Sequence, residues 1–336
     1  MKIAFLGSSD FSLTVLKALV QSKHQVVCVI TNVDKVSGRG QKVVSPVAKT
    51  FAIQNNIPVL QYNKVSVEGY DDIKTFKPDI LITASFGQIL KQNILDLAPL
   101  GVINVHSSLL PKYRGSAPIN WAIIEGEKET GITIMKTNIG LDTGDMILKK
   151  TLEILPDETA GELSVRLSNL GAEALLEVLE DIENGNAKYE PQKEEEASYY
   201  PMLKKEMGKL DFNKSALQIV NLVRGLNPWP MCFVEEQINP QNVIKVIKAS
   251  IFKNESLTQN LQEFSVGQVV LSSPKTGLVI KCSDGFVSLD VIQAPNSKAM
   301  PSKSYLNGKT IPIPTRYPPP KSTSDVDLPS IVPVSL

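Results

Sequence analysis

The first half of the chain alternates short apolar runs with amphipathic stretches, and this alternation limits its fold more than any other feature. Between the apolar runs, residues 11–21 carry leucines at helical spacing, and residues 45–55 open with a Ser-Pro pair typical of a helix start. Strands that alternate with helices indicate βαβ units and a mostly parallel sheet. We therefore expect an α/β fold with a doubly wound, Rossmann-like sheet. The expected strands are 2–6, 26–31, 79–84, 101–105 and 132–138.

The pattern changes after residue 184. Residues 161–184 place leucines near one face and predict a long helix packed on the sheet. The next stretch is polar and proline-containing, as in an interdomain linker. Beyond a helix at 215–225, β-branched runs broken by Gly, Pro and Asn predict a small antiparallel barrel or sandwich. These runs are 243–251, 267–271, 278–281 and 286–291.

A chain of 336 residues is long enough for two domains, each with its own core. The pattern places the first domain at 1–189, the linker at 190–204 and the second domain at 205–312. Residues 313–336 are rich in proline and serine, so we expect this tail to be disordered.

Composition indicates the cellular compartment of the protein and the class of its binding partners. The formal net charge is zero, so attraction to a polyanion must come from local charge. Residues 201–310 hold 13 Lys and Arg against 8 Asp and Glu, which favours such a partner there. Cys28, Cys232 and Cys282 are odd in number and widely spaced, which predicts buried thiols. With neither a secretion signal nor a membrane-length apolar run, a cytoplasmic protein without membrane contact is expected.

The chain has only two histidines, so any imidazole chemistry must use one of them. His24 lies in a polar run at the end of the first expected helix and is interpreted as a surface residue without a role. His106 follows strand 101–105, and Asn104, two residues earlier, shares its face. In open α/β sheets, ligands bind beyond the carboxyl ends of the strands. Spacing alone leaves a site and simple bonding of loop backbone equally possible.

Longer motifs extend this interpretation. INVHSSLLPKYRGSAPINW at 103–121, LDTGD at 141–145, DILITASFGQIL at 79–90 and NPWP at 227–230 closely resemble the folate-dependent formyltransferases, with only the final tail outside the resemblance. The resemblance implies that Asn104, His106 and Asp142 are the catalytic set. It also implies an OB-like barrel for the second domain and formyl transfer from 10-formyltetrahydrofolate without a metal. A Gly7-Ser8-Ser9 turn lacks the GxGxxG pattern, which excludes a dinucleotide site.

The resemblance also implies which residues line the folate pocket, in two loops. For Phe86 and Leu90, ordinary core packing is nearly as good an interpretation. The chain departs from the family at Ser8-Ser9 and at Ser85-Phe86, which leaves the pocket's details open. The implied pocket residues are Ser108, Leu109, Leu110 and Pro111 of one loop, and Phe86, Gln88 and Leu90 of the other.

The implied acceptor is the α-amino group of methionyl-initiator tRNA, bound by a monomeric enzyme. The polar loop 34–42 would bring Arg39 and Lys42 to the tRNA acceptor stem, although a charged glycine loop alone is weak evidence. The excess of positive charge in the second domain favours binding to the phosphates of an RNA backbone. A UDP-amino-sugar N-formyltransferase is the main alternative, followed by a formyl-folate hydrolase and a non-catalytic RNA-binding protein. The glycine-rich loop and LDTGD favour the tRNA.

Overall fold

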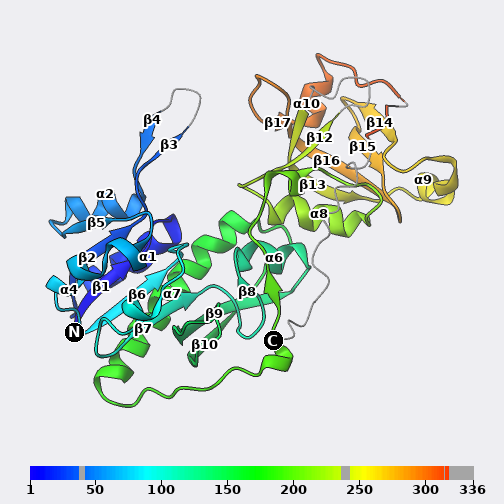
Figure 1. Ribbon diagram of the computed structural model, residues 1–336. Helices are drawn as coiled ribbons and strands as arrows, with labels where there is room; N and C mark the ends of the chain where they lie inside the picture. Colours follow the sequence, from blue (N-terminus) through cyan, green and yellow to red (C-terminus); the bar gives the residue numbers. More distant parts are fainter. Residues whose placement is uncertain (38–41, 236–242, 314, 318–336) are drawn as a thin grey trace.

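A computed structural model describes residues 1–37, 42–235, 243–313 and 315–317. Its N-terminal part holds a seven-stranded sheet in the order β10-β9-β7-β6-β1-β2-β5 (Figure 1). The five strands from β7 to β5 pair in parallel, and β9 pairs antiparallel with both β7 and β10. The doubly wound, mostly parallel sheet predicted from the sequence is confirmed. The strands are β1 (Lys2–Leu6), β2 (Gln25–Thr31), β5 (Val59–Gln61), β6 (Ile80–Ala84), β7 (Val102–His106), β9 (Glu129–Lys136) and β10 (Met146–Glu153).

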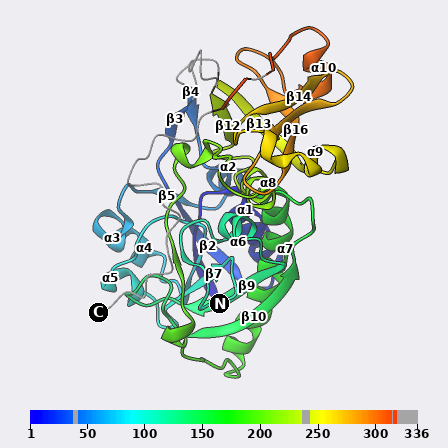
Figure 2. The ribbon, with the colours of Figure 1, turned by 90° about the vertical axis from the view of Figure 1, so that its right-hand side faces the viewer.

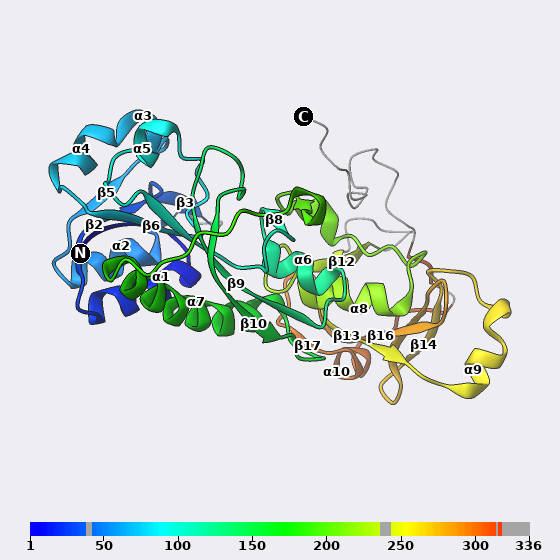
Figure 3. The ribbon, with the colours of Figure 1, turned by 90° about the horizontal axis from the view of Figure 1, so that it is seen from below.

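Helices cover both faces of this sheet (Figure 3). On one face the buried cluster includes residues of α1 (Asp10–Gln21), α2 (Val47–Gln54), α6 (Pro118–Ile124) and α7 (Ala160–Glu183). On the other face a second buried cluster includes residues of α3 (Val65–Glu68), α4 (Tyr70–Thr75) and α5 (Gln92–Leu95). Helix α7 starts with a capping box formed by Thr159 and Glu162, which satisfies exposed backbone donors of its first turn.

The strand order reverses between β1 and β6, one strand away from β7. The chain runs from β1 outward to β2 and β5, then crosses to the other side of β1 for β6 and β7. Such a reversal leaves a crevice at the carboxyl ends of the neighbouring strands. Ile103 and Val105 belong to the cluster on the α7 side, whereas Val102 belongs to the opposite cluster. Asn104 and His106 therefore share the face opposite α7, as their two-residue spacing predicts.

The C-terminal part is an antiparallel sheet in the order β12-β13-β16-β15-β14, with β17 paired to β16, as expected for its β-rich sequence. Its strands are β12 (Cys232–Glu235), β13 (Val243–Phe252), β14 (Val269–Ser273), β15 (Gly277–Lys281), β16 (Phe286–Gln293) and β17 (Met300–Pro301). The accompanying helices are α8 (Ala216–Gly225), α9 (Glu255–Gln259) and α10 (Ser302–Leu306). A separate hairpin of β3 (Lys35–Ser37) and β4 (Lys42–Val44) projects from the first sheet toward the side of the C-terminal sheet (Figures 1 and 2).

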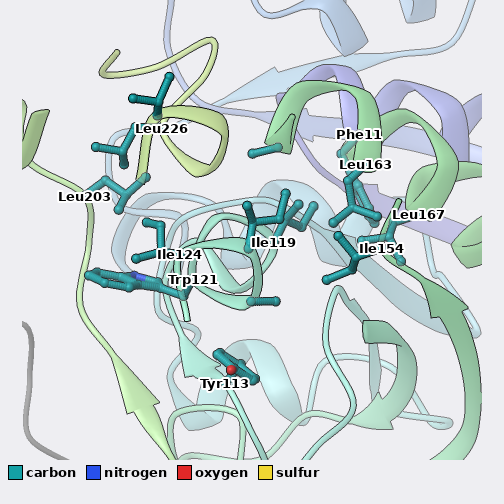
Figure 4. Close-up of a cluster of buried hydrophobic side chains, with 14 of the residues drawn as sticks. Phe11, Tyr113, Ile119, Trp121, Ile124, Ile154, Leu163, Leu167, Leu203 and Leu226 are labelled. Atoms are coloured by element: carbon teal, nitrogen blue, oxygen red, sulfur yellow. The ribbon is translucent and has the colours of Figure 1, made fainter. Parts of the chain in front are cut away.

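A single buried apolar cluster includes residues of both sheets. Figure 4 shows the part of it around α6 and α7. At the junction Trp121 of α6 is fully buried, and its indole N–H donates to the carbonyl oxygen of Pro201 at 2.9 Å. Helix α8 packs so closely on α6 that a Cβ added at Gly225 would lie 2.5 Å from Ile124. Burial of this apolar surface holds the two parts of the chain together.

The expected surface position of His24 is wrong. Its side chain is buried, and Nδ1 lies 3.4 Å from an Oε1 atom of Glu183 at the end of α7. Burial is the main cause of a lowered pKa for His24, which the Glu183 carboxylate partly offsets. The polar residues beside His24 gave no sign that the end of a helix far along the chain covers it.

Within the predicted tail, residues 315–317 make backbone hydrogen bonds to the stretch that leads into β14. The backbone N–H of Val269 donates to the carbonyl oxygen of Thr315, and that of Tyr317 donates to the carbonyl oxygen of Gly267, both at 2.9 Å. Tyr317 is buried against the second sheet. Its partners are residues 267–269, which lead into β14, and the proline-rich composition of the segment gave no sign of them. Residues 314 and 318–336 of the predicted tail lie outside the described residues.

All three cysteines are free and buried, as predicted. Burial raises the pKa of the Cys28 thiol to about 12, so this thiol is unreactive near neutral pH. Within the described ranges, no helix combines the length and apolar character needed to cross a membrane.

The packing of α7 predicts a difference between two residues of the same helix. Leu167 is fully buried under the sheet, whereas Val165 is 62% exposed. Leu167→Ala should lower the free energy of unfolding by about 2–5 kcal/mol, because it leaves a cavity in the core. Val165→Ala, the matched control, should change it by less than about 0.5 kcal/mol. Urea denaturation followed by circular dichroism measures both, and equal effects would contradict the packing.

Candidate active site

Asn104 lies at the carboxyl end of β7, where Thr83 of β6 is its neighbour in register. The Thr83 hydroxyl donates a hydrogen bond to Oδ1 of Asn104 at 2.9 Å. Because this bond engages the carbonyl side of the amide, the NH₂ group is left to donate to a bound group. The neighbouring strand therefore orients Asn104 as a neutral hydrogen-bond donor.

His106 ends β7 and is 6% exposed. Its Nε2 lies 3.1 Å from the carbonyl oxygen of Tyr113. Since a carbonyl oxygen only accepts, Nε2 carries the proton and Nδ1 has the free lone pair in the neutral ring. Nδ1 lies 3.7 Å from Oδ1 of Asp142, so the structure brings these two predicted residues together from a strand end and a separate loop.

Asp142 belongs to the tight loop that joins β9 to β10. A Cβ at Gly144 would lie only 1.7 Å from the carbonyl oxygen of Lys136, so this position requires glycine. Asp142 itself has a φ of 54°, in the left-handed region that is unfavourable for a residue with a side chain. Its Oδ2 accepts a hydrogen bond from the backbone N–H of Gly115 at 2.8 Å. The other oxygen, Oδ1, is the one that faces His106.

Tyr113 is held firmly in the conformation that aims its carbonyl oxygen at His106. Its φ of 60° is also left-handed. Its ring stacks on Tyr200 with centroids 4.8 Å apart, and its hydroxyl donates to Glu127 at 2.8 Å. Burial, reinforced by the Glu127 carboxylate, raises the pKa of Tyr113 well above its usual value, so this hydroxyl remains a donor.

Two residues that the sequence analysis did not single out complete this surface. Arg114 is 1% exposed, and its Nε donates to Oε1 of Gln192 at 3.0 Å. The guanidinium also pairs with Glu194 at 2.8 Å, and this bond lowers the pKa of the Glu194 carboxyl. Gln192 donates in turn to the carbonyl oxygens of Asp142 at 2.8 Å and Gly144 at 2.7 Å. Arg114 lies within the motif at 103–121, which pointed to this region of the chain. No motif or pattern near Gln192 indicated that it belongs to the site.

The loop implied by the resemblance to line one side of the folate pocket is tied to β9. The Thr133 hydroxyl donates to the carbonyl oxygen of Ser108 at 2.7 Å and accepts from the backbone N–H of Leu110 at 3.1 Å. Thr133 is the partner of His106 in register. Leu110 packs with Met135 and Met146, and Pro111 is buried, whereas Leu109 is partly exposed.

The opposing loop packs in a separate apolar cluster. Phe86 and Leu90 are 5% and 7% exposed and belong to the cluster that contains Leu6. The amide of Gln88 is fully engaged: it donates to Asn32 at 2.8 Å and to a backbone carbonyl at 2.9 Å, and accepts from a backbone N–H at 2.8 Å. These three side chains therefore hold the loop in place, and the structure does not gather them with Leu110 into one cluster.

Of the two predicted tRNA contacts, Arg39 lies outside the described residues. Lys42 begins β4, at the end of the hairpin that bears this loop. A cavity of about 590 Å³ lies at the beginnings of α1 and α7, where Phe11, Ser116 and Gly161 line it together with Met202 and Trp229. Among the residues that the structure describes, no cluster of His, Cys, Asp and Glu could hold a metal ion.

Comparison with known proteins places the chain in a family. Residues 1–179 match the formyl transferase family and residues 202–310 match the formyl transferase C-terminal domain, which defines the class. The methionyl-tRNA formyltransferase of Acetivibrio thermocellus is 45% identical over 312 residues, covering 93% of this chain and 97% of that relative. The enzyme of the same name from Clostridioides difficile is 44% identical, covering 93% and 98%. The chain therefore belongs to the methionyl-tRNA formyltransferase family.

Solved structures share the fold at lower identity. WlaRD, a sugar 3N-formyl transferase, is 22% identical with a TM-score of 0.62, covering 89% of this chain and 99% of its own. HypX from Aquifex aeolicus, in complex with tetrahydrofolic acid, is 18% identical with a TM-score of 0.62, covering 91% of this chain and 47% of its own.

The orientation of Asn104 by Thr83 predicts a kinetic effect. Thr83→Val removes one hydrogen bond of about 1 kcal/mol, so kcat for formyl transfer should fall about fivefold with little change in KM. Thr137→Val is the matched control, because the buried Thr137 hydroxyl has no hydrogen-bond partner among the described residues. Steady-state kinetics tests both, and an equal loss in the two variants would refute the orienting role.

Proposed function

We propose that this protein transfers the formyl group of 10-formyltetrahydrofolate to the α-amino group of methionyl-initiator tRNA, with Asn104, His106 and Asp142 as its catalytic residues. The observation that carries the proposal is the approach of a buried imidazole to a carboxylate at the strand end that also bears a preoriented amide. The identity to named methionyl-tRNA formyltransferases supports the reaction. No observation here favours the UDP-amino-sugar alternative.

The first chemical requirement is stabilisation of negative charge. Attack of the amine nitrogen on the formyl carbon gives a tetrahedral intermediate whose oxygen becomes an anion. The NH₂ group of Asn104, left free by the bond from Thr83, can donate to that oxygen without adding charge to the site. One such donor typically contributes about 2.7–4 kcal/mol to the transition state.

The second requirement is proton transfer. An α-amino group titrates near 7.7–8.0 in peptides, so about a tenth or more of the acceptor is already neutral at pH 7 and can attack. His106 then takes a proton from the new C–N nitrogen at Nδ1, because Nε2 is committed to Tyr113. Asp142 balances the charge of the resulting imidazolium. As the bond from the formyl carbon to the folate nitrogen breaks, that nitrogen receives a proton, relayed from His106 through water.

The folate side of the site is formed by the two loops that the resemblance implies. Ser108 and Leu110 are fixed to β9 beside His106, so their backbone and the half-exposed Leu109 can meet the flat pterin ring. We assign Phe86, Gln88 and Leu90 the task of shaping the opposing loop, since their side chains are packed or fully bonded. Pro111 closes the first loop.

The acceptor side uses both parts of the chain. Arg39 stands in the sequence between the two strands of the β3–β4 hairpin, and Lys42 begins the second of them. The hairpin projects from the first sheet on the side of the molecule where the C-terminal sheet also lies (Figures 1 and 2). The C-terminal sheet lies within residues 201–310, where Lys and Arg exceed Asp and Glu. This positive charge favours binding to the phosphates of an RNA backbone. Ser116, the neighbour of the Gly115 that binds Asp142, lines the cavity beside Trp229, and we assign this cavity to the aminoacyl end of the acceptor.

An acceptor test decides the proposal. The protein should formylate methionyl-tRNA from 10-formyltetrahydrofolate, and should leave a UDP-amino sugar unmodified. Asn104→Ala should lower kcat by about 10²–10³ because the intermediate loses its donor, and His106→Ala by about 10²–10⁴ because proton transfer loses its base. Formylation of the sugar in place of the tRNA, or near wild-type turnover in either variant at saturating substrates, would disprove the assignment.

The acceptor side predicts a response to mutation and to salt. Arg39→Ala should raise KM for methionyl-tRNA and leave KM for the folate unchanged, because the loop contacts only the RNA. The affinity for tRNA should fall as salt rises, with a shallower slope in the variant that has lost a phosphate contact. Filter binding from low to moderate salt measures the slopes. A salt-independent affinity, or equal losses for tRNA and folate, would count against this role.

A further inference from the structure

The segment between the two domains is bound to the first domain at several places. Glu190 exchanges backbone hydrogen bonds with Met146, at the start of β10. Gln192 binds the loop that carries Asp142. Farther on, β11 (Tyr199–Tyr200) pairs in parallel with β8 (Arg114–Gly115). The polar composition that predicted a linker therefore belongs to a segment folded against the candidate active site.

Gln192 has no freedom to turn its side-chain amide. Its NH₂ group donates to the carbonyl oxygens of Asp142 and Gly144, and its Oε1 accepts from Nε of Arg114. Exchanging the oxygen and nitrogen would set an oxygen against two carbonyl oxygens and an NH₂ group against a guanidinium. Arg114 therefore fixes which way Gln192 points.

Asp142 needs such a contact because its backbone is strained. A residue with a side chain pays about 1–3 kcal/mol for a left-handed conformation and keeps it only where several contacts define it. The carboxylate of Asp142 is held by Gly115, and its carbonyl oxygen is held by Gln192. Losing the second contact would let the backbone of the loop relax and would shift the carboxylate relative to His106, although Gly115 still binds it.

We propose that Gln192 is a positioning residue for formyl transfer: it fixes the backbone of Asp142 so that Oδ1 faces Nδ1 of His106. Arg114 holds Gln192 in the required orientation. Gln192 acts only through Asp142 and needs no contact with either substrate. This inference rests on the proposed function for its kinetic test, and on the loop contacts alone for its structural one.

The variant Gln192→Glu separates the two halves of this contact. It keeps an oxygen for Arg114 but cannot donate to the carbonyl oxygens of Asp142 and Gly144. We expect kcat to fall by about 10- to 100-fold, since a small misplacement of a catalytic group has effects of that size. KM for folate and for methionyl-tRNA should stay within about twofold. Gln192→Met, which has a similar length and no charge, should show the same loss of kcat.

The matched control is Gln92→Glu on α5, where the glutamine bonds only to the exposed side chain of Asp96. It should behave as wild type. An unchanged kcat in Gln192→Glu, or a raised KM with kcat intact, would overturn the positioning role.

Hydrogen exchange separates this inference from the proposed function. Amides of residues 137–146 should exchange faster in Gln192→Glu than in wild type, with thermal unfolding at a similar temperature. Unchanged exchange in that loop would overturn the positioning role whatever the activity. A wild-type protein that does not formylate methionyl-tRNA would instead disprove the proposed function, while faster exchange would still support the contact between Gln192 and the loop.

Discussion

The candidate site depends on a guanidinium buried away from water. Arg114 is 1% exposed, and a buried charge is strongly unfavourable unless its partners are well placed. Those partners, Gln192 and Glu194, come from the segment that leads to the second domain. Docking of this segment therefore satisfies the charge, and through Gln192 it also fixes the loop of Asp142. Assembly of the catalytic surface is coupled in this way to the connection between the two parts of the chain.

Regular periodicity made the sheet and one edge of the site predictable. Alternating apolar runs located β1, β2, β6 and β7 within a residue or two at their ends, because buried parallel strands need such runs. The two-residue period of a strand then put Asn104 and His106 on one face without further information. Asp142 differs, since an aspartate in a turn has no periodic signal. Only the resemblance of LDTGD to a known family pointed to it, and the structure places its carboxylate beside His106.

What the sequence concealed are contacts between segments far apart in the chain. Gln192 sits in a polar stretch typical of a linker, and its three bonds appear only when that stretch folds back on the loop. His24 looked exposed because the end of α7 that covers it is remote in sequence. Tyr317 likewise bonds to Gly267, a residue remote in sequence, whereas the composition around Tyr317 predicts a disordered tail. Local patterns carry no information about such partners.

The tautomer of His106 determines how Asp142 can contribute. With Nε2 donating to Tyr113, the ring's lone pair at Nδ1 faces a carboxylate that has no proton to share, so the neutral pair gains little. Once Nδ1 takes a proton from the attacking nitrogen, the same 3.7 Å separation joins a cation to an anion in a largely buried site. The interaction is thus stronger after proton transfer than before it, and only interactions that strengthen toward the transition state accelerate a reaction. A rigid Asp142 loop preserves that difference, since a mobile carboxylate would find other partners while the imidazole is neutral.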